Sequence, residues 1–304
     1  MSKKYKRNLE FKQSAIGEFV CIDGDDYNVL VVGQGEDTLV LMAGEGVPCP
    51  VLDFKPLWWP LKDKFNIVVI EKAGYGFSDV TDKPSDVATL VNDNREMLQK
   101  LNISPPYVLV AHSYAGLEAI YWAQKYSEEI KAIISLDMTI PSFVNIAKIP
   151  LILKLIMCFS RVFKNANISE KRAIKVTEKF PSFNHPSLDK EDRETYLRVM
   201  RSRFMTINMV NEIKMMTNNA DAVRRLEYPR DVPILFFSSD LVDAAKNAKK
   251  SVHELLQLQK DFISKFYYAK HIILDCDHFV HIHESERVAK EIEDFIGGIG
   301  TRLL

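Results

Sequence analysis

Cysteine is scarce in this sequence, and its four copies lie far apart. They are Cys21, Cys49, Cys158 and Cys276, and no two of them form a C-x-x-C pair. Four scattered cysteines in a chain of this length are too few for a disulfide-rich scaffold, and a structural zinc site usually shows paired ligands such as C-x-x-C. The pattern is typical of reduced thiols, so we expect a cytoplasmic protein that holds no metal ion and no other cofactor.

A surplus of positive charge is also missing. The 304 residues include 40 lysines and arginines against 41 aspartates and glutamates, which gives a formal net charge of −1. Proteins that bind nucleic acid usually present a strongly basic surface to the phosphates. The basic start at residues 3–7 is too short to change this balance. We therefore expect no nucleic-acid partner.

No apolar run is long enough to cross a bilayer. The longest, residues 149–159, is interrupted by Lys154 and falls short of the roughly 20 residues that a membrane-spanning helix needs. The residues after the basic start stay polar through Gln13, so no signal peptide is predicted. Hydrophobic residues still make up 47% of the chain, which is enough for the core of one large domain with an insertion.

An apolar strand that stops abruptly at a serine is the most informative feature present. Residues 107–112 have the pattern of a buried strand, and a helical repeat starts directly after Ser113. A turn this tight needs small residues two positions before and after the serine, and Ala111 and Ala115 meet that demand. The first amides of the helix would favour developing negative charge beside the hydroxyl. The pattern predicts a serine nucleophile, although an ordinary buried serine that ends a strand has the same letters.

Three landmarks in the first half of the chain resemble the α/β-hydrolase superfamily. Residues 39–46 include its third strand and the turn that follows, residues 66–78 include its fourth strand and the motif that follows, and the serine turn follows its fifth strand. The resemblance runs from about Gly17 to about Ile299 and is best for capped esterases and lipases. It implies an α/β fold with a mostly parallel central sheet flanked by helices, and a helical cap inserted between strands six and seven.

The first landmark also concerns the oxyanion hole. The family takes one oxyanion-binding amide from the residue after the nucleophile, here Tyr114, and a second from the position of Glu45. A carboxylate that faced the oxyanion would oppose catalysis, so we expect the Glu45 side chain to point toward solvent or a cation while its backbone N–H binds. Alternatively, Gly44 and Gly46 merely allow a turn. The departures from the family pattern remove no reacting atom; they are Ala43, Glu71, Ala73, Ala111 and Ala115.

The resemblance assigns the catalytic base to His278, on the loop after the apolar strand 271–274. A neutral imidazole can take the proton of a serine and return it to a leaving group. The neighbouring His281 and His283 are expected to be loop or helix-start residues. A metal site is less favoured because no second group of ligands stands out. Its members would be Asp275, Asp277, His278, His281 and His283.

The acid of the triad stays open among three aspartates. Asp240 and Asp243 follow the predicted strand seven, where the family usually has its acid, and they keep the chain order serine, acid, histidine. The usual glycine is missing from this loop, so the alignment can shift by a few residues. Asp137 ends strand six, from which some members recruit the acid, although helix capping or a salt bridge would also explain it. We favour Asp240, with Asp137 and then Asp243 as alternatives.

A helix-rich insertion separates strands six and seven. The resemblance implies that residues 140–228 form a cap over Ser113, on a core made of residues 1–139 and 229–304. The methionines and aliphatic side chains of this insertion could line an apolar pocket for an acyl chain or a greasy alcohol, or could simply pack the cap onto the core. Residues 149–159 could also touch a lipid surface weakly.

These features predict a metal-free serine hydrolase that cleaves a carboxylic ester of small or medium acyl chain through an acyl-enzyme. Serine at the turn argues against the haloalkane dehalogenase and epoxide hydrolase chemistry of the superfamily, which uses a carboxylate nucleophile. An aminopeptidase, a thioesterase or an acyltransferase would use the same groups. Outside enzymes, the alternative is a small-molecule-binding relative with little catalytic activity.

Overall fold

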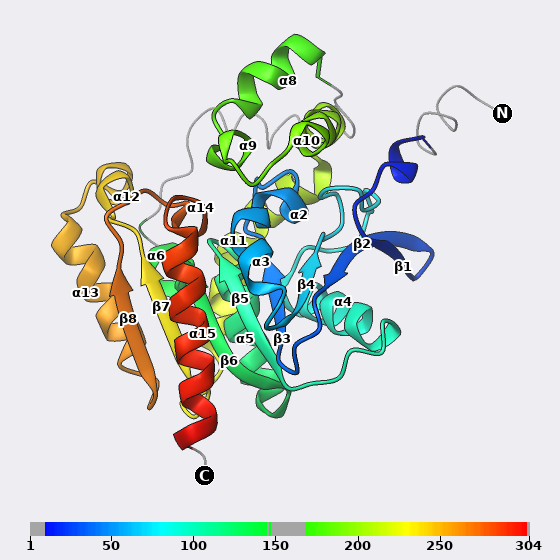
Figure 1. Ribbon diagram of the computed structural model, residues 1–304. Coiled ribbons are helices and arrows are strands. Elements are labelled where there is room, and N and C mark those ends of the chain that lie inside the picture. The colour runs from blue at the N-terminus through cyan, green and yellow to red at the C-terminus, as the bar shows by residue number, and fades with distance from the viewer. Residues whose placement is uncertain (1–9, 145, 147–167, 303–304) are drawn as a thin grey trace.

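The computed structural model of the protein describes residues 10–144, 146 and 168–302. In this part of the chain, one sheet of eight strands forms the centre of the molecule, in the order β1-β2-β4-β3-β5-β6-β7-β8 (Figure 1). The strands are β1 (Glu18–Ile22), β2 (Asp25–Val32), β3 (Thr38–Met42), β4 (Asn66–Ile70), β5 (Tyr107–His112), β6 (Ile130–Leu136), β7 (Ile234–Ser238) and β8 (Ala269–Ile273). The predicted α/β fold class is confirmed.

Strands β1 and β2 form the leading hairpin that the sequence predicts. Its two-residue turn has Asp23 and Gly24 at φ 53° and 91°, the left-handed backbone that such short hairpins require. Strand β2 then pairs antiparallel with β4, and the strands from β3 to β8 pair parallel with one another. The inner parallel strands from β3 to β7 are mostly apolar because helices cover both faces of the sheet there, whereas the edge strand β8 is largely exposed.

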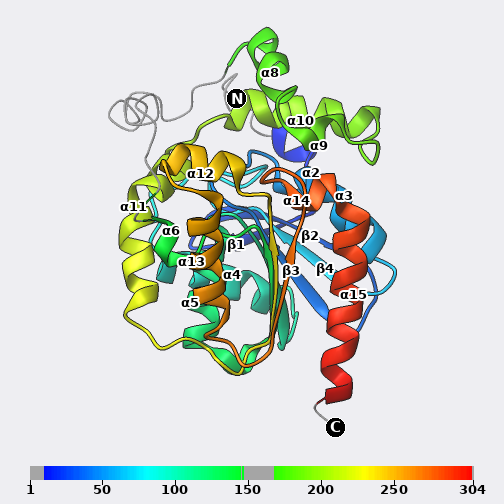
Figure 2. The same ribbon diagram turned by 90° about the vertical axis from the view of Figure 1, so that its left-hand side faces the viewer.

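Helices lie on both sides of the sheet, as Figure 2 shows with the sheet seen from its side. The core helices are α2 (Pro50–Asp53), α3 (Lys55–Leu61), α4 (Val87–Lys100), α5 (Ala115–Lys125), η1 (Ser127–Glu129), α12 (Val242–Ala248), α13 (Val252–Ile263), α14 (Val280–His283) and α15 (Ser285–Arg302). Helices α3 and α15 cover one face, and α4, α5 and α13 cover the other. This is the layered arrangement that alternating strands and helices favour.

Strand β3 shows how the two faces arise from the sequence. Val40 and Met42 pack with the α4 and α5 side chains, whereas Leu39 and Leu41 pack with those of α3 and α15. Successive side chains of a strand point to opposite faces, so a strand buried on both sides must be apolar at every position. All four side chains are buried. The sheet therefore holds its carboxyl end rigidly.

The insertion between β6 and β7 contains α6 (Pro141–Val144), α8 (Glu170–Thr177), α9 (Pro181–Asn184), α10 (Lys190–Arg203) and α11 (Ile207–Arg224). Helices α8 to α10 lie above the carboxyl ends of the strands, and α11 runs down beside the core (Figures 1 and 2). The assignment of residues 140–228 as a cap on a core of 1–139 and 229–304 stays a prediction. The segment 149–159, with its suggested lipid contact, lies outside the described residues.

Two polar contacts join the insertion to the core near α2. The Asp53 carboxylate accepts hydrogen bonds from Ser182 of α9 and, at 2.8 Å, from the Tyr196 hydroxyl of α10. Burial raises the pKa of Asp53 to about 6, although these two hydrogen bonds favour its charged form. Within the described ranges, no helix combines the length and the apolar character that a bilayer crossing needs.

Candidate active site

Ser113 lies on the turn between β5 and α5, with a backbone φ of 54°. A left-handed conformation is strained for a residue with a side chain and costs on the order of 1–3 kcal/mol. The turn is held from the next strand, because the Ser113 carbonyl accepts a hydrogen bond of 2.7 Å from the Thr139 N–H. Ala111 and Ala115 are fully buried on either side. The predicted tight strand-turn-helix geometry around Ser113 is therefore present.

Residues 44–46 pack directly against this turn. A Cβ atom built on Gly44 would lie 2.6 Å from Ser113 Cβ and 3.0 Å from the Tyr114 backbone nitrogen. Real Cβ atoms do not come so close to other atoms, so glycine is required at position 44 if the turn keeps this shape. The loop after β3 thus brings Glu45 beside the residue that follows Ser113.

His278 forms a hydrogen-bonded pair with Asp137. Its Nδ1 lies 2.7 Å from Asp137 Oδ2, while Asp137 Oδ1 accepts a hydrogen bond of 3.0 Å from the Ser239 N–H. Burial alone would lower the pKa of His278, but the hydrogen bond and charge of Asp137, with the charge of Glu45, raise it overall. The Asp137 backbone is left-handed, with φ 49°, which turns its carboxylate from the end of β6 toward the His278 loop.

The favoured sequence candidate, Asp240, is not the aspartate that contacts His278. Its carboxylate accepts a hydrogen bond of 2.9 Å from the Val242 N–H at the start of α12. Asp243 is exposed in the first turn of the same helix. The structure instead brings the alternative, Asp137, to His278. The correction has a topological reason: β6 pairs directly with β5, so Asp137, the residue after β6, lies next to the Ser113 turn, whereas β7 is one strand further away.

The Glu45 side chain is half-buried among charged groups rather than turned to open solvent. Burial and the nearby Glu212 carboxylate raise its pKa to about 7, against the opposing charges of His278 and Lys72. The carboxyl group thus lies within electrostatic range of the Glu212 carboxylate as well as of Lys72 and His278, so the expected direction of the side chain stays a prediction. A carboxyl group that titrates near neutral pH therefore lies within electrostatic range of the histidine.

Two further imidazole rings, those of His112 and His281, pack near His278. The sequence analysis did not predict this packing. The His112 ring centroid lies 4.7 Å from that of His278 and 4.6 Å from that of His281. Burial lowers the pKa of His112 well below its usual value and that of His281 to about 3, so both rings are neutral. Within the described ranges, no three histidine, cysteine or acidic side chains are grouped so as to hold a metal ion.

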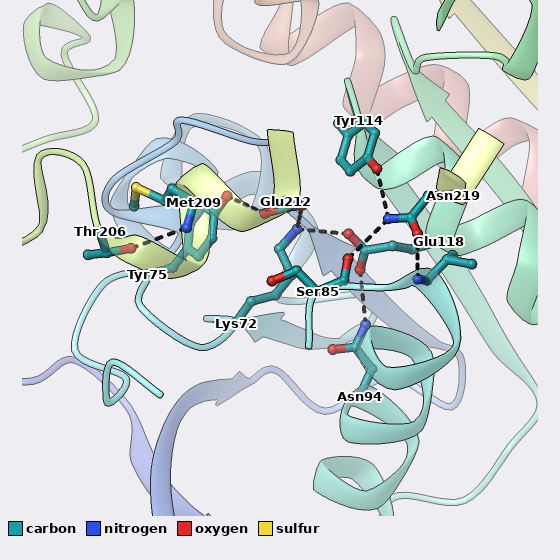
Figure 3. Close-up of polar contacts among 11 residues, drawn as sticks. Lys72, Tyr75, Ser85, Asn94, Tyr114, Glu118, Thr206, Met209, Glu212 and Asn219 are labelled. Carbon is teal, nitrogen blue, oxygen red and sulfur yellow. Dashed lines mark hydrogen bonds and ion pairs between the residues drawn. The ribbon is translucent and has the colours of Figure 1, made fainter. Parts of the chain in front are cut away.

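A buried cluster of charged side chains lies near Tyr114 (Figure 3). Lys72 Nζ donates to Glu118 Oε1 at 2.7 Å and also to Glu212, and the Tyr75 hydroxyl donates to Glu212 at 2.5 Å. Burial raises the pKa of Glu118 to about 7, although Lys72 opposes this effect. Sequence reasoning missed the cluster because its members come from three distant segments. The available signal was a lysine and a glutamate within otherwise apolar elements.

Three methionines of the described part of the insertion pack against other side chains. Met200 and Met209 are completely buried, and Met216 is partly buried against the core. Their burial agrees with packing of the inserted helices, and the apolar pocket stays a prediction. The remaining apolar side chains suggested for the pocket fall in 151–159, outside the described residues.

The strand order, the strained serine after β5 and the histidine–aspartate pair at the carboxyl ends of the strands define an α/β-hydrolase. The chain belongs to the α/β-hydrolase superfamily. A family model described as the alpha/beta hydrolase fold matches residues 55–156. The predicted resemblance is thus confirmed.

Individual relatives are similar over nearly the whole chain. The uncharacterized protein YbdG of Bacillus subtilis is 30% identical over 284 residues, which cover 92% of this chain and 85% of the relative. A cis-3-alkyl-4-alkyloxetan-2-one decarboxylase of Shewanella oneidensis is 23% identical, with 95% and 89% covered. Among solved structures, a haloalkane dehalogenase variant from Bradyrhizobium elkanii has a TM-score of 0.65 at 14% identity, with 94% and 97% covered. The last likeness concerns the fold alone.

Proposed function

We propose that this protein is a serine hydrolase that cleaves carboxylic esters, with Ser113 as nucleophile, His278 as base and Asp137 as the acid of the triad. The hydrogen bond of 2.7 Å between His278 and Asp137 carries this proposal, because it joins the end of the chain to the strand beside the Ser113 turn. An aspartate in this position keeps the imidazole in one tautomer and stabilises the imidazolium. The strain at Ser113 supports the same reading.

In the proposed reaction, Ser113 Oγ attacks the ester carbonyl carbon while His278 Nε2 accepts the hydroxyl proton. The backbone N–H groups of Tyr114 and Glu45 bind the oxyanion of the tetrahedral intermediate. The C–O bond to the alcohol then breaks, and the imidazolium protonates the departing oxygen. A water molecule, deprotonated by His278, cleaves the acyl-enzyme in the same way and releases the acid.

The chemical class of the substrate follows from the serine. The residue on the turn after β5 is a serine and not an aspartate, which favours acyl transfer over the carboxylate-nucleophile chemistry of dehalogenases. An apolar acyl or alcohol part stays our expectation for the substrate. A panel of p-nitrophenyl esters of increasing chain length, run beside amino-acyl anilides and acyl thioesters, separates an esterase from an aminopeptidase or a thioesterase. Product analysis in the presence of an added alcohol detects acyl transfer.

One relative adds a second candidate to the panel. It is named for action on an oxetan-2-one, which is a four-membered cyclic ester. A cis-dialkyl β-lactone should therefore be tested with this protein. Formation of a β-hydroxy acid would indicate hydrolysis, whereas formation of an alkene and carbon dioxide would indicate decarboxylation.

Active-site labelling is the direct test of the nucleophile. A fluorophosphonate should label the intact protein stoichiometrically, and Ser113→Ala and His278→Ala should both abolish labelling, because attack needs the hydroxyl and its base. Ser127→Ala is the control, since Ser127 is exposed at the amino end of β6 and should label normally. An intact protein that takes no label would reject the proposal in favour of a binding protein, and one that still labels after Ser113→Ala would show that another residue is the nucleophile.

The charge of the Glu45 side chain should affect the pH dependence of kcat/KM. Its charge contributes to the raised pKa of His278. The base must be neutral, so activity rises as the pH passes this pKa. Glu45→Gln removes the negative charge, destabilises the imidazolium and should shift the acidic limb of kcat/KM to lower pH by about half a unit to one unit. Glu36→Gln, at an exposed site before β3, is the control. A shift to higher pH would contradict this role.

A further inference from the structure

Helix α11 joins the core through polar side chains on one face. Asn208, Glu212 and Asn219 are all buried, although the helix belongs to the inserted segment. Residues four and eleven positions apart on an α-helix lie on the same side. Asn208 binds the Thr81 backbone, its Oδ1 accepting from the N–H at 3.1 Å, and Glu212 binds Lys72. The helix thus contacts separate core loops along its length.

Asn219 makes the contacts nearest to the Ser113 turn (Figure 3). Its Nδ2 donates to the Tyr114 hydroxyl at 2.8 Å and to the Ser85 carbonyl at 3.1 Å, and its Oδ1 accepts from the Val87 N–H at 2.9 Å. Both amide hydrogens and the carbonyl oxygen therefore have buried partners. A buried amide group that loses its hydrogen-bond partners is energetically unfavourable, so the Asn219 side chain is confined to this orientation.

The ion cluster contacts the first turn of α5 at a second residue, Glu118. Glu118 lies four residues after Tyr114 and therefore on the same face of the helix. Lys72 connects it to Glu212 of α11. Helix α11 consequently holds the first turn of α5 at both ends, through Asn219 at Tyr114 and through the lysine at Glu118.

We propose that Asn219 is a positioning residue for the oxyanion hole. Tyr114 supplies the backbone N–H that binds the oxyanion in the proposed reaction, on which this inference rests. The Asn219 hydrogen bond fixes the Tyr114 side chain and, through it, the direction of that N–H. Oxyanion donors act because they are oriented before the reaction begins, so a small displacement lowers kcat. The inserted segment therefore contributes to catalysis from behind the turn.

The test compares Asn219→Ala with Asn208→Ala. Both remove a buried amide from the same face of α11, but Asn208 binds the Thr81 loop and not Tyr114. Both variants should lower the thermal unfolding midpoint by a few degrees. Asn219→Ala should also lower kcat about tenfold to hundredfold with KM changed less than about twofold, while Asn208→Ala should keep kcat.

A thionoester distinguishes the oxyanion hole from general loosening. Its C=S sulfur accepts hydrogen bonds weakly, so its hydrolysis depends less on the Tyr114 N–H. Asn219→Ala should therefore reduce the ratio of ester to thionoester kcat/KM. Tyr114→Phe removes the other partner of the same hydrogen bond, and combining it with Asn219→Ala should add little further loss of kcat. If Asn219→Ala does not fold, Tyr114→Phe alone tests the same hydrogen bond.

The outcomes separate this inference from the proposed function. If the intact protein neither labels nor hydrolyses any ester, the proposed function fails and the role of Asn219 fails with it. If the intact protein is active but Asn219→Ala or Tyr114→Phe keeps the normal kcat and ester-to-thionoester ratio, only the positioning role is overturned. An equal loss of kcat in Asn208→Ala would also overturn it.

Discussion

Replacing Asp137 with asparagine should lower kcat by about three to four orders of magnitude while the protein stays folded. Asparagine is isosteric with aspartate and tolerates the left-handed backbone, which has φ 49° at this position. Its carbonyl oxygen can still accept the hydrogen bond from the Ser239 N–H. Its amide group, however, would donate toward His278 Nδ1 and favour the tautomer whose Nε2 carries the proton. That imidazole cannot accept the proton of Ser113.

Asp240→Asn is the matched control, because Asp240 is the favoured candidate from the sequence and follows the neighbouring strand. Its carboxylate binds the Val242 N–H of the following helix, and an asparagine oxygen can do the same. We expect kcat within about twofold of the parent, and the same for the exposed Asp243. Steady-state kinetics on one p-nitrophenyl ester measures all three variants. A large loss in Asp240→Asn with normal activity in Asp137→Asn would return the acid to β7.

Gly44→Ala should reduce kcat/KM about hundredfold or more. The new Cβ would lie 2.6 Å from Ser113 Cβ and 2.9 Å from the His112 carbonyl oxygen, so the loop and the Ser113 turn must move apart. A displacement of about 1 Å at a reacting group can cost on the order of 100-fold in rate. The same movement would shift the Glu45 N–H away from the oxyanion. The thermal unfolding midpoint should fall as well, because the loop is buried.

Gly297→Ala separates this steric effect from a general effect of alanine. Gly297 is exposed on α15, and no atom lies within 4 Å of its added Cβ. Alanine favours a helix over glycine by about 0.5–1 kcal/mol, so this variant should be equally active and no less stable. Normal kcat/KM in Gly44→Ala would show that the loop after β3 is not in contact with the working nucleophile.

Local sequence patterns and the family resemblance were sufficient for the main elements and for two of the candidate site residues. Residues 107–112 could only be a buried strand, and small residues flank Ser113 because the turn after that strand has no room for larger ones. The resemblance to the family assigns His278, and this agrees with the rule that a loop after the last strand of a parallel sheet opens at the carboxyl edge, where the Ser113 turn also lies. These inferences use neighbours in sequence and general rules of topology.

The choice of the acid needed distances between segments far apart in the chain. Asp137, Asp240 and Asp243 all follow strands at the same edge, so their sequence context is nearly equivalent. The left-handed backbone at Asp137 and the turn of Asp240 toward Val242 decide which carboxylate reaches the histidine. Backbone conformation at single loop residues is set by the packing around them, which the letters alone do not specify.

By itself, the sequence determined the α/β fold and the strained serine turn, because hydrophobic periodicity and small-residue spacing act over a few neighbouring residues, and its family resemblance predicted the position of the histidine. The tertiary structure alone decided that Asp137 meets His278, that neutral imidazoles pack behind it, and that Asn219 reaches Tyr114 from 105 residues away. Those contacts depend on the register of parallel strands and on the path of α11 along the core, and both are settled only when the whole chain packs.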